Sequence, residues 1–169
     1  DTIGVAYTAF QIPMCRLVRG DKKDEIMPDF EKAEEVIKEA IPELKNSDDI
    51  KALGDMNQNL AYIAQQEGEI RRAIDLYSRA LVYRQRAKDK RGTGLTFARL
   101  GECYLEVGDI ATAKSVSKCA MEIFKEIGDV NRIKQVEAVL AKIQEKEKKL
   151  GGVEMEKPKT IGVFAGLLT

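Results

Sequence analysis

The side chains that could do chemistry in this chain are its cysteines and its carboxylates. The 169 residues include no histidine, which removes the commonest general base and transition-metal ligand. Cys15, Cys103 and Cys119 have no CxxC spacing, and an attacking thiol would have no histidine to activate it. We therefore predict free, buried thiols, no catalytic residue, no metal site and no cofactor.

The carboxylates recur with other residues at a fixed spacing of forty, which gives them a structural interpretation. Three of these series are Ala33, Ala73 and Ala113; Ala40, Ala80 and Ala120; and Asp49, Asp89 and Asp129. A period of this length is typical of stacked helix-turn-helix units, which bury their apolar faces only against neighbouring units. Each aspartate would precede a helix and accept hydrogen bonds from its free N–H groups. Such an array provides a binding surface rather than a reaction centre.

Apolar residues recur at helical spacing through most of the chain. Ile70, Ala73, Ile74 and Tyr77, for example, follow the i, i+3, i+4, i+7 pattern of an amphipathic helix. The predicted helices are 50–66, 69–87, 93–107, 109–127 and 129–150, with Gly68 and Gly108 in the turns. The last of them becomes polar toward its end, as a helix that caps an array should.

The N-terminal part of the chain is less regular. We expect a helix within residues 3–18, where Pro13 either lies inside the helix or restricts it to the second half of the stretch. A charged loop is expected from residue 20 to residue 28. The next helix should end or kink near Ala40, because Pro42 lacks an N–H and disfavours helix before it.

Two of the units resemble the tetratricopeptide repeats. The residues that carry the resemblance are Phe97, Leu100, Gly101, Tyr104, Gly108, Ala113 and Ala120 in one unit, and Leu60, Ala61, Ala64, Gly68, Ala73, Tyr77 and Ala80 in the other. The spacing is similar to the long, forty-residue variety of this repeat, although Ser117 stands where an aromatic residue is usual. The resemblance implies an all-α, right-handed solenoid of about three helical hairpins and a C-terminal capping helix.

This resemblance divides the chain into a repeat domain and a tail. The repeat domain is 1–150, with units at about 3–48, 49–88 and 89–128 and a capping helix at 129–150. Residues 151–169 contain Pro158 and a short apolar end, and we expect them to be flexible or to dock on a partner.

The resemblance also implies where a partner binds. In such arrays the first helix of each hairpin lines the concave side, on which a peptide or helix lies. The residues expected to contact the partner are Gln58, Tyr62, Gln65, Arg99, Glu102 and Leu105. Members that clamp a terminal carboxylate use Lys, Asn and Arg, of which only Arg99 is present here. We therefore expect a non-catalytic adaptor, scaffold or assembly factor; ordinary solvated helix surface is the alternative for each of these residues.

Charge sums to zero but is unevenly distributed. Residues 21–55 hold 12 acids and 6 bases, whereas residues 69–99 hold 9 bases and 3 acids. The basic stretch from Arg71 to Arg99 suggests an alternative function as an RNA-binding or other nucleic-acid-binding repeat. Two further interpretations are a solvated face with local ion pairs and head-to-tail association of copies through the acidic and basic segments.

The compartment follows only from general features. No apolar run reaches the roughly 20 residues that a helix needs to cross a bilayer. Free thiols fit an intracellular, cytoplasmic location. Because the chain begins with Asp1 rather than Met, an organelle interior reached after removal of a transit peptide is the alternative.

Overall fold

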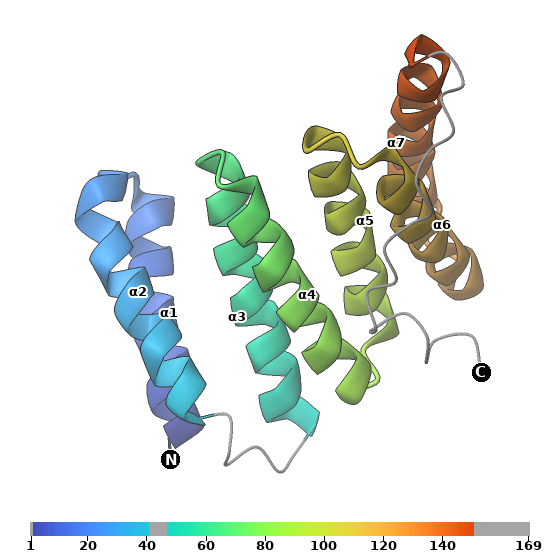
Figure 1. The fold of residues 1–169 in the computed structure, drawn as a ribbon. Helices are drawn as coiled ribbons and strands as arrows, with labels where there is room; N and C mark the ends of the chain where they lie inside the picture. Colours follow the sequence, from blue (N-terminus) through green and yellow to red (C-terminus); the bar gives the residue numbers. More distant parts are fainter. Residues whose placement is uncertain (1, 41–46, 151–169) are drawn as a thin grey trace.

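Seven helices follow one another along residues 2–40 and 47–150, the part of the chain that the computed structural model describes, and no strand occurs there. They are α1 (Thr2–Arg19), α2 (Lys23–Ala40), α3 (Ser47–Gln66), α4 (Ile70–Arg86), α5 (Lys90–Glu106), α6 (Ile110–Ile127) and α7 (Val130–Lys149). The helices pack as three consecutive hairpins, α1–α2, α3–α4 and α5–α6, and α7 packs on α6 (Figure 1). The predicted all-α repeat architecture is confirmed. The expected kink at Pro42 and the tail 151–169 lie outside the described residues.

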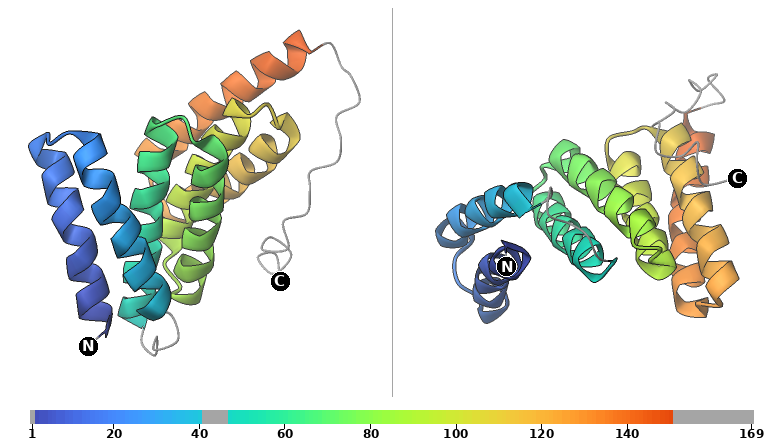
Figure 2. Two further views of the ribbon diagram at one scale, coloured as in Figure 1. Left: turned by 60° about the vertical axis from the view of Figure 1, so that its left-hand side comes forward. Right: turned by 90° about the horizontal axis from the view of Figure 1, so that it is seen from below.

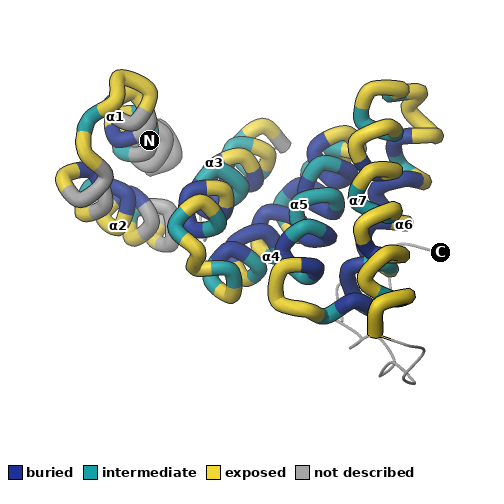
Figure 3. The backbone as a smooth tube through the Cα atoms, turned by 90° about the horizontal axis from the view of Figure 1, so that it is seen from above, coloured by how far each residue is buried: buried dark blue, intermediate teal, exposed yellow. Residues whose placement is uncertain are grey.

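The hairpins form two layers. The first helices α1, α3 and α5 lie in one layer with α7, and the second helices lie in the other (Figures 2 and 3). Figure 3 shows that buried residues gather where the layers and the successive hairpins face each other. Leu53, Tyr77, Phe97 and Phe124 are fully buried there, and the removal of this apolar surface from water stabilises the array. We call the surface over α3, α5 and α7 the inner face.

The recurring alanines lie at the contacts between helices. Ala33, Ala73, Ala80, Ala113 and Ala120 are all 0% exposed. A methyl side chain lets two helix backbones approach closely, so that the larger residues beside it interdigitate without voids. The prediction that these positions face neighbouring helices is therefore confirmed; the side chain of the remaining alanine of these series lies outside the described ones.

Aspartates begin three of the helices as caps. Asp89 Oδ1 accepts a hydrogen bond from Gly92 N at 3.0 Å, and Asp129 Oδ1 accepts one from Arg132 N at 3.2 Å. Both predicted caps are confirmed. The prediction for Asp49 is wrong, because α3 begins at Ser47 and contains Asp49 in its first turn. Its carboxylate still lies near the positive end of that helix.

The first hairpin departs from the prediction because of its prolines. α1 runs through Pro13, and α2 begins at Lys23 and contains Pro28, so the loop expected at residues 20–28 is wrong from residue 23 onward. Ile26 and Phe30 on either side of Pro28 are 1% and 2% exposed. Burial of these two side chains, worth a few kcal/mol, outweighs the hydrogen bond that proline cannot donate. α2 ends at Ala40, as predicted.

Ion pairs hold the turn between α1 and α2. Arg16 Nε lies 3.1 Å from Asp21 Oδ2, and Arg19 Nη2 lies 2.6 Å from the same oxygen. A second bond joins Arg16 Nη1 to Asp29 at 2.5 Å. Hydrogen bonds from Arg19 and then Arg16 lower the pKa of Asp21 to about 2. These charges add to the left-handed backbone of Gly20, at which φ is 91°, in forming the turn.

α7 ends the described array with a polar outer side. Forty residues after Phe97 and Tyr104, which pack from α5 toward α6, α7 carries Glu137 and Gln144, both exposed. Its other side is apolar, and Val136 there is 2% exposed. A helix of this kind needs no further helix to cover it.

Candidate partner-binding surface

Three of the predicted contact residues meet on the inner face. The guanidinium carbon of Arg99 on α5 lies 5.6 Å from the centre of the Tyr62 ring on α3, within the range of a cation–π interaction. Arg99 Nη1 also donates a hydrogen bond to Glu102 Oε2 at 2.9 Å. The Tyr62 side chain remains 45% exposed. A ring, a cation and an anion from two hairpins thus form one surface group, which we call the Tyr62 cluster.

Gln58 and Gln65 connect α3 to α5. Gln58 Oε1 accepts from Thr96 Oγ1 at 3.0 Å, and Gln65 Nε2 donates to Glu106 Oε1 at 2.8 Å. Gln65 Oε1 in turn accepts a longer bond from the Tyr77 hydroxyl at 3.3 Å. Both amides are half-buried and use polar atoms within the chain. They therefore hold the two helices in register beneath the Tyr62 cluster.

Leu105 does not lie on the open surface where we expected it. It is 8% exposed and packs with Ile110, Ala113 and Ile143 in a second core cluster. α7 passes over this position, and Lys146 Nζ donates to Leu105 O at 3.0 Å. Helical spacing placed Leu105 on the inner side of α5 but could not show that α7 covers it.

The Tyr62 cluster keeps its cation over the physiological pH range. Burial by itself would lower the pKa of Arg99, but the hydrogen bond that it donates to Glu102 and the charge of that carboxylate raise it overall. Arg99 therefore stays cationic. Burial also raises the pKa of Tyr77, which lies beneath the cluster, so its hydroxyl stays protonated.

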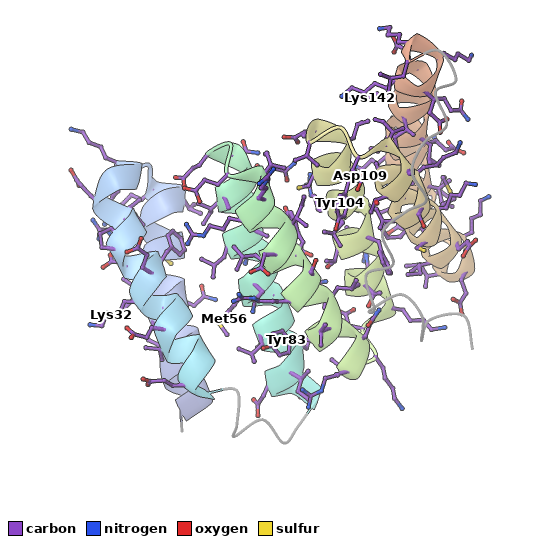
Figure 4. The ribbon with its side chains drawn as sticks, viewed as in Figure 1. Lys32, Met56, Tyr83, Tyr104, Asp109 and Lys142 are labelled. Carbon is purple, nitrogen blue, oxygen red and sulfur yellow. The ribbon has the colours of Figure 1, made fainter. Side chains whose placement is uncertain are left out.

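A hollow of about 340 Å³ lies beside the Tyr62 cluster, between α5 and α7. Its lining residues are Leu95, Ala98, Arg99 and Glu102 on α5, Ser117 and Phe124 on α6, and Arg132, Gln135, Val136, Ala138, Val139 and Lys142 on α7. Lys142, labelled in Figure 4, projects from α7. The volume is near the lower end of the range for ligand pockets, so it suits a side chain of a peptide.

The α7 side of this hollow was not predicted from the sequence, although the forty-residue period indicates it. Gln135, Ala138, Val139 and Lys142 follow Leu95, Ala98, Arg99 and Glu102 at that spacing, and all eight line the hollow. Interpreting α7 only as a cap hid the fact that it presents the same surface positions as α5.

The cysteines and carboxylates of the described residues form no metal-binding group. No group of three or more His, Cys, Asp or Glu side chains gathers there to hold a metal ion. Cys103 is buried, and burial raises the pKa of its thiol to about 12. Because a thiolate is the nucleophilic form, this thiol is inert at neutral pH. Cys15 and Cys119 are also free, as predicted, but Cys119 is only half-buried and Cys15 is exposed, so the prediction of a buried thiol is wrong for Cys15.

Most cations of the basic stretch Arg71–Arg99 have acidic partners. Six of its nine basic side chains form ion pairs: Arg72 with Glu69, Arg79 with Asp75, Arg84 with Asp55, Lys90 with Glu126, Arg91 with Asp129, and Arg99 with Glu102. Arg84, expected on the solvated surface, is 4% exposed. Local ion pairing therefore describes this stretch, and the nucleic-acid alternative gains no support from it. Head-to-tail association of copies stays a prediction.

None of the helices in the described part of the chain combines the length and the apolar character needed to span a membrane.

Most of the second and third hairpins matches a known protein family. Residues 53–126 match the family model for the tetratricopeptide repeat. The matched segment begins within α3 and ends within α6, so it covers most of the two hairpins that carry the Tyr62 cluster. No curated protein matches the chain.

Proposed function

We infer that this chain is a non-catalytic protein-interaction module, because residues 53–126 belong to the tetratricopeptide repeat family. Repeats of this family generally serve as protein–protein interaction modules. We propose that the partner is a peptide or helical segment bound on the inner face, and that the chain acts as an adaptor, scaffold or assembly factor. The observation that supports this is the Tyr62 cluster, which is accessible across two hairpins.

The side chains of the Tyr62 cluster are preorganised for binding. Tyr and Arg are the residue types most enriched at the centres of protein interfaces. Here Arg99 is already held between Tyr62 and Glu102, and Gln58 and Gln65 hold the two helices beneath them. Little side-chain freedom remains to be lost when a partner binds, and this lowers the entropic cost of association.

A pull-down of native partners from cell extract tests the proposal. The Tyr62→Ala/Arg99→Ala variant should lose bound partner about tenfold or more, as truncation of central interface residues does. The matched control is Lys118→Ala/Glu122→Ala, which removes two exposed side chains from α6 in the other layer. Circular dichroism should show equal helix content in both variants. Unchanged partner recovery with the first variant would show that the inner face is not the binding surface.

A further inference from the structure

The hollow between α5 and α7 arises where one repeat position changes residue. Tyr77 on α4 and Ser117 on α6 lie forty residues apart and therefore occupy the same place in successive repeats. Tyr77 is 0% exposed, and its ring fills the space between α3 and α5 with its hydroxyl on Gln65. Ser117 is 1% exposed but ends at its hydroxyl. The volume that a ring occupies in one repeat is thus open in the next.

The neighbours of Tyr77 show that the two spaces correspond. Its hydroxyl lies within the electrostatic influence of Cys103, Arg99, Glu102 and Tyr62. The residues forty positions later are Ile143, Val139, Lys142 and Glu102. The last three line the hollow, and Ile143 is buried in the second core cluster beside it. The hollow is therefore the place of the Tyr77 ring, shifted by one repeat.

The floor of the hollow contains an unsatisfied polar group. Ser117 Oγ is buried and has no hydrogen-bond partner in the structure, a state that costs free energy because the group has left water. The hydroxyl lies against Gly101, where a Cβ would come within 2.3 Å of it.

The rim of the hollow carries more positive than negative charge. Arg99, Arg132 and Lys142 are its cations, and Glu102 is its acid. Arg99 is engaged by Glu102, so the other two cations account for the excess. Complementary charge on a partner would be negative, which steers its approach and selects its sequence.

We propose that this hollow receives an aromatic side chain from an acidic segment of the partner protein. The ring takes the position that Tyr77 holds one repeat earlier, against the apolar walls formed by Leu95, Val136 and Val139. Carboxylates that flank the ring in the partner sequence pair with Arg132 and Lys142. This inference rests on the proposed function, since it specifies what the inner face recognises.

The first test uses a short peptide with one phenylalanine between glutamates. Its titration into the full chain should shift the methyl NMR signals of Leu95, Val136 and Val139. A matched peptide with alanine in place of phenylalanine, and another with lysines in place of the glutamates, should each bind about tenfold or more weakly. If the glutamate–phenylalanine peptide leaves these signals unshifted, or if the alanine peptide binds equally well, the proposal is overturned.

The second test fills the hollow from within. Ser117→Tyr places in the third hairpin the residue that the second hairpin already accommodates, and it should reduce binding of the phenylalanine peptide about tenfold or more. Ser117→Ala is the matched control and should keep the binding. If Ser117→Tyr raises the unfolding temperature yet binds the peptide as the natural chain does, the aromatic site is elsewhere and the proposal fails.

Two further outcomes distinguish this inference from the proposed function and from occupation of the hollow by the chain's own C-terminal segment. If native partners are lost with Tyr62→Ala/Arg99→Ala but retained with Ser117→Tyr, the inner face binds partners and the inference about the hollow alone fails. If the peptide shifts the three methyl signals only in a Phe164→Ala variant, the occupant is the chain's own C-terminal segment, which overturns the assignment to a partner.

Discussion

Two helix junctions, one in the second hairpin and one in the third, share one register and have opposite chemistry. At the first, Arg84 on α4 is buried against Gly54 on α3, whose Cβ would lie 2.8 Å from Arg84 Cγ. Forty residues later, Phe124 on α6 is buried against Gly94 on α5, whose Cβ would lie 3.0 Å from the ring. A glycine thus makes room for a large side chain in both cases, but one side chain is charged and the other is apolar.

The partners of these side chains change together with them. Arg84 Nη2 donates to Asp55 Oδ1 at 2.7 Å, and Arg84 Nη1 lies 3.5 Å from Asp89 Oδ2. At the position of Asp55, the next repeat has Leu95, which lines the hollow with Phe124. One junction is therefore closed by an ion pair and the other by an apolar pair.

The ion-paired junction and the apolar junction have different physical requirements. The ion-paired junction must satisfy a buried guanidinium, and Arg84 Nε still has no partner in the structure. The apolar junction has no such requirement, but it stays incompletely filled and borders the hollow. We expect the first to be sensitive to changes of charge and the second to changes of volume.

The largest effects should come from truncating the two side chains. Phe124→Ala should lower the free energy of unfolding by about 4 kcal/mol, since it leaves a cavity at a fully buried site. Arg84→Ala should lower it by about 2 kcal/mol, less than for a fully buried pair because Asp55 is half-exposed and can be solvated. Urea unfolding followed by circular dichroism measures both. An Arg84→Ala variant as stable as the natural chain would show that the ion pair does not stabilise the junction.

Exchanging the chemistry of the junctions sharpens the comparison. Arg84→Phe/Asp55→Leu copies the pair found forty residues later, and its stability should lie within about 1 kcal/mol of the natural chain. The losses in the free energy of unfolding of the two single variants should sum to about 1 kcal/mol more than the loss of the double variant. A double-mutant cycle in urea measures the coupling. Strictly additive losses would mean that the two positions are independent.

The helix that connects the junctions offers a matched pair of glycines. In Gly92→Ala the new Cβ would lie 1.8 Å from Arg84 Nη1 and 2.1 Å from Asp89 Oδ2, so the ion pair must move; we expect a loss of about 1–2 kcal/mol. In Gly94→Ala the nearest atoms are 3.0 Å away, and the better helix propensity of alanine should cancel most of the crowding, to within about 0.5 kcal/mol. Thermal unfolding should show that Gly92→Ala is the less stable of the two variants. If Gly94→Ala is the less stable one, the ion pair of Arg84 moves aside for the new Cβ.

The loops at the two junctions should respond in opposite directions. Lys88 has φ of 55°, and Gly128, forty residues later, has φ of 72°. Left-handed backbone strains a residue with a Cβ, so Lys88→Gly should stabilise the chain by up to about 1 kcal/mol and Gly128→Ala should destabilise it by about 1 kcal/mol. Unfolding midpoints in urea measure both changes. Destabilisation by Lys88→Gly would show that the lysine side chain outweighs the strain.

The smallest effect on stability at neutral pH concerns the thiol of Cys103. Burial raises the pKa of Cys103 from an ordinary 9.0 to about 12. The resulting stability is complete below pH 9 and is lost as pH rises toward 12, because only the unfolded thiol can then ionise freely. The position forty residues later holds Ile143, which does not titrate. Cys103→Val should therefore lose less stability between pH 9 and pH 12 than the natural chain, as thermal unfolding in that range would show.

The sequence predicted the repeats well where helix geometry alone decides the pattern. The four helices from α3 to α6 and the turns at Gly68 and Gly108 follow from local periodicity. The first hairpin was predicted less well, because the burial of Ile26 and Phe30 carries α2 through Pro28. Helix propensity depends on neighbouring residues in the sequence, so it does not include the free energy of burying these two side chains.

The candidate site shows the same division. Tyr62, Arg99 and Glu102 were predicted from a family resemblance, and their mutual contacts appear in the structure. The burial of Leu105 and the contribution of α7 were not predicted. Both depend on where α7 crosses α5, which no local pattern reports.

The register of this protein follows from its sequence alone: which residues are equivalent in successive repeats, which alanines are buried, and that Asp89 and Asp129 begin helices. These properties follow from 3.6 residues per turn and from a constant repeat length. Only the tertiary structure decided that Arg84 is buried on Asp55 and that Ser117 leaves a hollow. The reason is that both outcomes depend on distances between helices, and residues far apart in sequence set those distances.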